Sequence, residues 1–216
     1  MIAPQRPRVL LADDHLMVAE ALKTLLAPEF DLVGVVEDGR ALVEAAAALR
    51  PDVIVADVTM PHLNGIDALV QLRKRGDRVP VVFLTMHRDA SFARRALDAG
   101  ASGFVLKHSA PAELVSAIRA ALEGKTYLTP QIAGEVLESM KQRPQPDGGS
   151  LASLTPRQRE ILQLVAEGQS AKQIGSILAI SPRTVEFHKY QMMEALGLHT
   201  NADLIHFAFK HGLVER

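Results

Sequence analysis

Residues 52–57 read Asp-Val-Ile-Val-Ala-Asp, a run of four apolar residues that leads directly into a carboxylate. A run this short and this rich in β-branched side chains is typical of a strand buried on both faces of a parallel sheet. Further runs of this kind fall within the first 128 residues, at Arg8–Ala12, Asp31–Val36, Val79–Leu84 and Gly103–Leu106. The chain therefore opens with the strands of a parallel sheet.

Segments with helical spacing of Leu, Val and Ala follow each strand, and we expect helices at Met17–Leu26, Arg40–Leu49, Ile66–Lys74, Ala90–Ala99 and Pro111–Leu122. Repeated strand-helix units predict a doubly wound α/β sandwich. After a tail of residues 1–7, we expect this domain to span residues 8–128. Right-handed crossovers place the carboxyl ends of its strands at one edge of the sheet, where open α/β folds bind their ligands.

A linker over residues 129–150 is expected next. It should begin with a helix from Pro130 to about Gln142, capped by Thr129, and continue as a flexible segment with two prolines and two glycines. Residues 151–216 have a wholly helical pattern. Capping boxes and start signals at Thr155, Ser170, Ser181 and Thr200 predict a second, all-α domain of four short helices.

Composition limits the function classes without choosing one. The 216 residues contain no cysteine, which excludes disulfides and cysteine-ligated metals. No apolar run approaches the roughly 18 residues of a membrane span, and residues 1–8 lack a signal-peptide core, so we expect a cytoplasmic protein without a membrane partner. The net charge is −1, so the charge alone does not indicate a nucleic-acid partner.

Five polar residues fall where strands end: Asp13 and Asp14 after the first, Asp57 after the third, Thr85 at the end of the fourth, and Lys107 after the fifth. Each has an ordinary explanation by itself, such as a helix cap for Asp14 or a solvated loop for Lys107. Together they would bring three mutually repelling carboxylates to one edge. A hard divalent cation, most simply Mg²⁺, would offset that repulsion with Lys107.

This arrangement suits phosphoryl transfer to a carboxylate. Asp57 would be the nucleophile and form an acyl phosphate, while Lys107 and the Thr85 hydroxyl would bind phosphoryl oxygens. The predicted Mg²⁺ ligands are Asp14, Asp57, the backbone carbonyl of Thr59 and, through water, Asp13. Loop histidines at positions 15, 62, 87 and 108 lack zinc-like spacing, and we interpret them as solvated.

Residues 8–125 closely resemble the receiver domains of response regulators. The resemblance rests on Asp13-Asp14, Asp57, Met60-Pro61, Asn64-Gly65, Thr85 and Gly103-Phe-Val-Leu-Lys107. It implies a five-stranded sheet of order 2-1-3-4-5, phosphorylation of Asp57 by a histidine kinase, Mg²⁺ dependence, and a switch in which Thr85 and Phe104 move together. His108 stands where the family often has proline, so a cis peptide is not expected there. Met86 is bulkier than the small residue usual after the threonine.

The second domain contains a helix-turn-helix, formed by Ser170–Leu178, a short turn, and Pro182–Leu196. On the latter helix the face predicted to point inward carries Val185, His188, Met192 and Leu196, and the opposite face carries Arg183, Glu186, Phe187, Lys189 and Tyr190. A solvated face explains the charges. It does not explain outward aromatic side chains, which suggest a contact surface.

Residues 151–212 resemble the LuxR-type helix-turn-helix of NarL/FixJ response regulators. The motifs are Leu154–Leu162, Val165–Gly168, Lys172–Ile174 and Ile180–His188. The resemblance implies that the third helix enters the major groove. We expect Glu186, Phe187 and Tyr190 at base edges and Lys172, Arg183, Thr184 and Lys189 at phosphates. In the family the fourth helix forms a dimer contact, here expected at Leu204, Ile205 and Ala208, with core packing as the alternative.

The sequence thus predicts a two-component response regulator rather than a dedicated enzyme. Its expected partners are a sensor histidine kinase and inverted-repeat promoter DNA, a second copy of the chain when phosphorylated, and RNA polymerase as a further candidate. A phosphatase of the haloacid dehalogenase type would need an aspartate where Thr59 stands, and a small-molecule sensor would need an apolar pocket. A receiver that works without phosphorylation stays open as the alternative.

Overall fold

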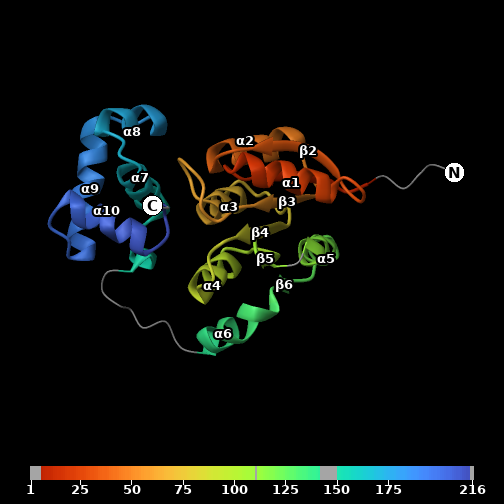
Figure 1. Ribbon diagram of the computed structural model, residues 1–216. Helices are drawn as coiled ribbons and strands as arrows, with labels where there is room; N and C mark the ends of the chain where they lie inside the picture. The colour runs from red at the N-terminus through yellow and green to blue at the C-terminus, as the bar shows by residue number, and fades with distance from the viewer. Residues whose placement is uncertain (1–5, 110, 142–149, 215–216) are drawn as a thin grey trace. The chain divides into compact units, whose positions relative to one another are not determined.

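The computed structural model describes residues 6–109, 111–141 and 150–214 (Figure 1). These residues form two compact units, which are divided in the sequence between Lys141 and Ser150. The predicted flexible part of the linker and most of the N-terminal tail lie outside the described residues. Among those described, none of the helices combines the length and hydrophobicity needed to cross a bilayer.

The N-terminal unit is built on a fully parallel sheet of order β2-β1-β3-β4-β5-β6. The strands are β1 (Arg8–Ala12), β2 (Asp31–Val36), β3 (Val53–Ala56), β4 (Val81–Thr85), β5 (Gly103–Leu106) and β6 (Tyr127–Leu128). The predicted α/β class and the 2-1-3-4-5 order are confirmed. The prediction of five strands is corrected, because the two-residue β6 pairs with β5 and extends the sheet by one strand.

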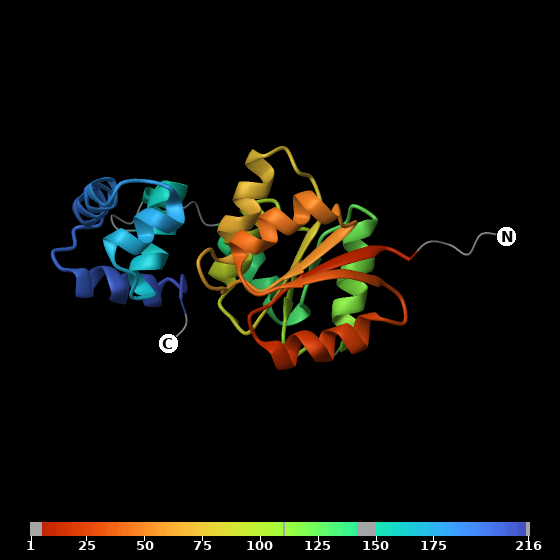
Figure 2. The same ribbon diagram turned by 90° about the horizontal axis from the view of Figure 1, so that it is seen from above.

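Helices cover both faces of this sheet (Figure 2). They are α1 (Leu16–Leu26), α2 (Gly39–Leu49), α3 (Gly65–Lys74), α4 (Ala90–Asp98), α5 (Pro111–Leu122) and α6 (Pro130–Lys141). Apolar residues of α1 and α5 pack on one face, against side chains such as Val9, Val55 and Val105. The other face carries α2, α3 and α4. Burial on both faces explains why β1, β3, β4 and β5 are almost continuously apolar.

Side-chain caps fix where several of these helices begin. The Asn64 side chain accepts a hydrogen bond from the backbone N–H of Asp67, and those of Asp38 and Asp89 cap α2 and α4 in the same way. By contrast, α1 is preceded by His15, which makes no side-chain capping bond. The interpretation of Asp14 as a helix cap is therefore wrong.

The C-terminal unit is all-helical, as predicted. A short 3₁₀ turn at Leu151–Ser153 precedes α7 (Pro156–Ala166), α8 (Ala171–Leu178), α9 (Pro182–Leu196) and α10 (Asn201–Lys210). Capping boxes with both reciprocal hydrogen bonds start α7, α8 and α10. The turn between α8 and α9 is tight, because a Cβ on Gly175 would lie 2.7 Å from the Ile180 carbonyl oxygen.

Candidate functional site: an acidic pocket and a recognition helix

Asp57 lies just past the carboxyl end of β3, in the centre of the sheet. Its backbone N–H donates to the Ala12 carbonyl at 2.8 Å, which continues the pairing of β3 with β1. The side chain is almost fully buried, at 4% exposure. The segment after it returns tightly onto α3, since the Gly65 N–H donates to the Val58 carbonyl at 2.8 Å. Fold topology thus fixes this carboxylate at the ligand-binding edge.

Lys107 extends from the end of β5 into the same place. Its Nζ lies 2.5 Å from Oδ2 of Asp57 and 2.9 Å from Oδ2 of Asp13, and all three side chains are at most 8% exposed. The backbone N–H of Lys107 donates to the Thr85 carbonyl at 2.8 Å, so the lysine is anchored to the neighbouring strand. A single ammonium therefore bridges two buried carboxylates.

The electrostatics of this cluster are those of a reactive site. The pKa of Asp57 is raised from 3.8 to about 6: burial is the largest cause, Lys107 opposes it, and the adjacent Asp13 adds to it. For Lys107, burial opposes the charged form, but Asp57 and Asp13 outweigh burial, so the pKa of the ammonium is raised. At Asp57, therefore, the effect of burial on the pKa is larger than the opposing effect of the adjacent Lys107 ammonium.

Asp14 and His15 complete the acidic side of the pocket. The Asp14 side chain is 31% exposed, and His15 Nδ1 lies 3.1 Å from its Oδ1 and 3.3 Å from Oδ1 of Asp13. One ligand atom from each of Asp13, Asp14, His15 and Asp57 falls within 4.8 Å of the others. Carboxylate oxygens gathered in this way fit a hard divalent cation. Sequence reasoning missed His15, because its approach depends on the backbone turn before α1.

Two further predicted residues flank the pocket. The backbone N–H of Thr59 donates to Oδ1 of Asp57 over a long 3.4 Å, and its hydroxyl contacts Nε2 of His87 at 2.7 Å. Thr85 is fully buried, and its Oγ1 accepts the backbone N–H of His87 at 3.2 Å. The structure thus gathers Asp13, Asp57, Thr59, Thr85 and Lys107 at one edge, as their positions in the sequence predicted.

Phe104, the predicted partner of Thr85 in a switch, is fully buried in β5 beside Phe83 of β4. Its carbonyl accepts the backbone N–H of Thr129 at 3.0 Å, just before α6 begins. The described residues contain no cis peptide bond, so the bond after Lys107 is trans, as the His108 substitution led us to expect.

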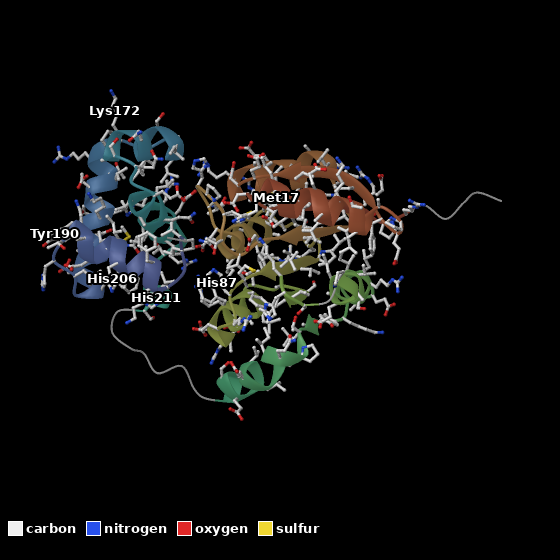
Figure 3. The ribbon with its side chains drawn as sticks, in the orientation of Figure 1. Met17, His87, Lys172, Tyr190, His206 and His211 are labelled. Atoms are coloured by element: carbon white, nitrogen blue, oxygen red, sulfur yellow. The ribbon has the colours of Figure 1, made fainter. Side chains whose placement is uncertain are left out.

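Helix α9, the second helix of the helix-turn-helix, presents a polar and aromatic face. Phe187 and Tyr190 are 58% and 68% exposed, and Figure 3 shows Tyr190 projecting away from the helix. Arg183 and Glu186 on this helix are exposed, as is Lys172 on α8, and Lys189 Nζ pairs with Oε1 of Glu186 at 3.1 Å. Thr184 is different in character. Its backbone N–H donates to Oγ of Ser181 and its hydroxyl contacts the same atom at 2.8 Å, so it helps to start the helix.

The predicted dimer contact on α10 needs correction. Leu204 and Ala208 are fully buried in the core of their own unit, so neither side chain can reach a second copy in this arrangement. Ile205 is only partly buried and also packs against this core. The apolar surface of α10 is thus mostly explained by packing on α7, which was the alternative interpretation.

Comparisons with known proteins agree with this geometry. The family described as response regulator receiver domain matches residues 9–119, and the family described as bacterial regulatory proteins, luxR family, matches residues 152–208. The chain is 32% identical over 207 residues to the response regulator UvrY of Escherichia coli O6:H1, covering 95% of this chain and 94% of UvrY.

Solved structures of the response regulator RcsB are also similar. One, from Salmonella typhimurium, has a TM-score of 0.65 at 26% identity and covers 96% of this chain and 98% of its own. Another, of two RcsB dimers bound to two parallel DNAs, has a TM-score of 0.60 at 26% identity and covers 94% and 98%.

Proposed function

This chain belongs to the two-component response regulators that join a receiver domain to a LuxR-type DNA-binding domain, and we propose that phosphorylation of Asp57 controls its binding to promoter DNA. Members of this family are generally transcription factors rather than enzymes. We assign residues 8–128 to the receiver, 129–150 to the linker and 151–216 to the DNA-binding domain. The observation that carries the proposal is the buried Lys107 ammonium between Asp57 and Asp13.

The two oxygens of Asp57 differ in a way that supports a nucleophilic role. Oδ2 is held by Lys107, while Oδ1 accepts only a long bond from the Thr59 N–H. We infer that Oδ1 attacks the phosphorus of a phosphohistidine on the partner kinase. The new O–P bond forms as the P–N bond breaks, and the imidazole nitrogen keeps the electron pair. Lys107 then pairs with a phosphoryl oxygen, and Thr85 donates its hydroxyl to another.

We propose Mg²⁺ as the cation of this site. Asp14, Asp57, the backbone carbonyl of Thr59 and, through water, Asp13 would hold it. When bound, the ion offsets negative charge on the phosphoryl oxygens. The donor set supports this choice, because clustered carboxylates and a carbonyl suit a hard ion.

For the DNA-binding domain, we propose that α9 enters the major groove. Glu186, Phe187 and Tyr190 would contact base edges, and Lys172, Arg183 and Lys189 would contact phosphates. The predicted phosphate contact of Thr184 is weaker, since its hydroxyl already engages Ser181. RcsB dimers bound to DNA support a DNA-bound dimer here. We propose that its site is an inverted repeat and that RNA polymerase is a further candidate partner.

Labelling with acetyl phosphate and Mg²⁺ tests the site assignment. The full-length chain should form an acid-stable, base-labile phosphoprotein, and Asp57→Asn should not. Asp31→Asn is the matched control, because Asp31 is an exposed aspartate at the start of β2. Equal labelling of Asp57→Asn and wild type would remove Asp57 from the mechanism.

The same experiment decides the alternative of a receiver that works without phosphorylation. If the wild-type chain takes up no label but binds promoter DNA with full affinity, that alternative replaces our proposal. If labelling strengthens DNA binding and Asp57→Asn abolishes the effect, phosphorylation is the control.

A further inference from the structure

His15 brings a ring nitrogen to the acidic pocket from the loop between β1 and α1. Its backbone N–H donates to Oδ1 of Asp13 at 2.9 Å, and its carbonyl accepts the Ala19 N–H at 3.0 Å in the first turn of α1. These two bonds fix the backbone of His15 beside the carboxylates. Its ring Nδ1 lies 3.1 Å from Oδ1 of Asp14 and 3.3 Å from Oδ1 of Asp13.

Oδ1 of Asp14 lacks a hydrogen-bond donor. The atom is shielded from solvent, and none of the residues that the structure describes donates a hydrogen bond to it, although His15 Nδ1 lies so near. A buried carboxylate oxygen without a donor is costly, and a bound cation is one way to satisfy it. A cation held by Oδ1 of Asp14 and Nδ1 of His15 would satisfy both atoms. The geometry therefore favours ligation by the imidazole over a hydrogen bond from it.

The distances suit a single metal ion. Bonds from such ions to nitrogen and oxygen are about 2.1 Å long, so two ligands at right angles lie about 3 Å apart. Both contacts of His15 Nδ1 are close to that value, and one ligand atom from each of Asp13, Asp14, His15 and Asp57 falls within 4.8 Å of the others. Mg²⁺ prefers oxygen ligands and keeps several waters, whereas imidazole suits transition ions. The nitrogen therefore adds affinity for transition ions in particular.

We propose that His15 is a further metal ligand of the acidic pocket, through Nδ1, and that it strengthens the binding of first-row transition ions such as Mn²⁺ without strengthening that of Mg²⁺. This inference rests on the metal site in the proposed function. The ion takes the lone pair of Nδ1, and the ring proton is on Nε2, as in other histidine ligands. His15 would thus determine which ions the receiver accepts.

Isothermal titration calorimetry on the full-length chain tests this inference, with Co²⁺ as the transition-ion probe and Mg²⁺ as the comparison. His15→Gln should weaken Co²⁺ binding at least about tenfold, since even residues that only hydrogen-bond to metal ligands contribute that much to affinity. The Mg²⁺ affinity should stay within about twofold of wild type, which also shows that the pocket is folded. His206→Gln changes an exposed histidine on α10 (Figure 3), and this matched control should leave both affinities unchanged.

Proton nuclear magnetic resonance of the Co²⁺-loaded chain detects the nitrogen ligand directly. Paramagnetic Co²⁺ shifts the protons of an imidazole bound to it far outside their ordinary range. Such shifted imidazole protons should appear in wild type and in His206→Gln, and they should be absent from His15→Gln.

An equal loss of Co²⁺ and Mg²⁺ affinity in His15→Gln would mean that His15 only orients the carboxylates, and the proposal would be overturned. Unchanged Co²⁺ affinity, or shifted imidazole protons that persist in this variant, would also overturn it. Asp57→Asn should weaken the binding of both ions, and if it does not, the ions bind elsewhere and the inference fails. Absence of labelling of wild type by acetyl phosphate counts against the proposed function alone, because metal binding is measured without a phosphoryl donor.

Discussion

Gly65 sits where no other residue fits, and Gly65→Ala should therefore damage the receiver. A Cβ at this position would lie 2.1 Å from the Asp57 carbonyl oxygen and 2.9 Å from Cε1 of Phe83. Ordinary contacts begin near 3.4 Å, so backbone must move by about an ångström. Phe83 is fully buried and cannot make room. Overpacking of this kind costs about 3 kcal/mol.

The matched control is Gly134→Ala in α6. A Cβ there meets nothing within 4 Å, so only helix propensity changes. The exchange should raise the free energy of unfolding by about 0.5–1 kcal/mol. The two substitutions are chemically identical and are expected to have opposite signs.

Hydrogen exchange of the peptide covering β3, read across a urea series, isolates the unfolding of the N-terminal unit in the full-length chain. A loss of about 3 kcal/mol corresponds to a midpoint lower by roughly 1.5 M urea. Since the clash falls on the Asp57 backbone, labelling by acetyl phosphate should also slow. A Gly65→Ala variant as stable as Gly134→Ala would refute the close approach of α3 to Asp57.

Three further outcomes follow from the electrostatics. Lys107→Met leaves two buried carboxylates facing each other, so without Mg²⁺ the free energy of unfolding at pH 7.5 should fall by about 3 kcal/mol. The control Lys23→Met changes an exposed lysine and should leave the free energy of unfolding unchanged. The pKa of Asp57 is raised from 3.8 to about 6 in the folded chain, so its contribution to stability should be lost as the pH rises through that range. The urea midpoint of wild type should therefore fall relative to that of Asp57→Asn between pH 4 and 7. If the midpoints of the two proteins change in parallel with pH, this expectation is wrong. Lys189→Ala should weaken binding to promoter and unrelated DNA alike and reduce the salt slope by about 1 in fluorescence anisotropy; an unchanged slope would remove Lys189 from the phosphate contacts.

The central strands β1, β3, β4 and β5 were predictable because they are buried on both faces and therefore almost continuously apolar. Their ends were less so. The run from Val79 suggested a strand two residues longer at its start than β4, which begins at Val81. The two residues of β6 are too short to show any period and form a strand only because they pair with β5.

The pocket was predictable for a different reason. Parallel topology alone brings the ends of β1, β3, β4 and β5 together, so the residues after them converge whatever the loops do. The contacts of His15 and His87 depend on loop conformation, which the spacing of residues in the sequence does not predict. Leu204 and Ala208 are buried in the core of their own unit, because a resemblance assigns a dimer contact to a helix without showing which of its side chains meet the core.

Because β6 pairs with β5, the strand that carries Phe104 is hydrogen-bonded on both of its edges. With β6 paired beside it, β5 is an interior strand, and Phe104 gives its carbonyl to the Thr129 N–H at 3.0 Å. Thr129 is fully buried, and its hydroxyl accepts the Leu106 N–H at 3.2 Å. Any displacement of the Phe104 backbone must therefore carry Thr129 along or break a buried hydrogen bond, which is costly. Since Thr129 immediately precedes α6, a displacement of the Phe104 backbone that kept this hydrogen bond would also displace the residue from which α6 begins.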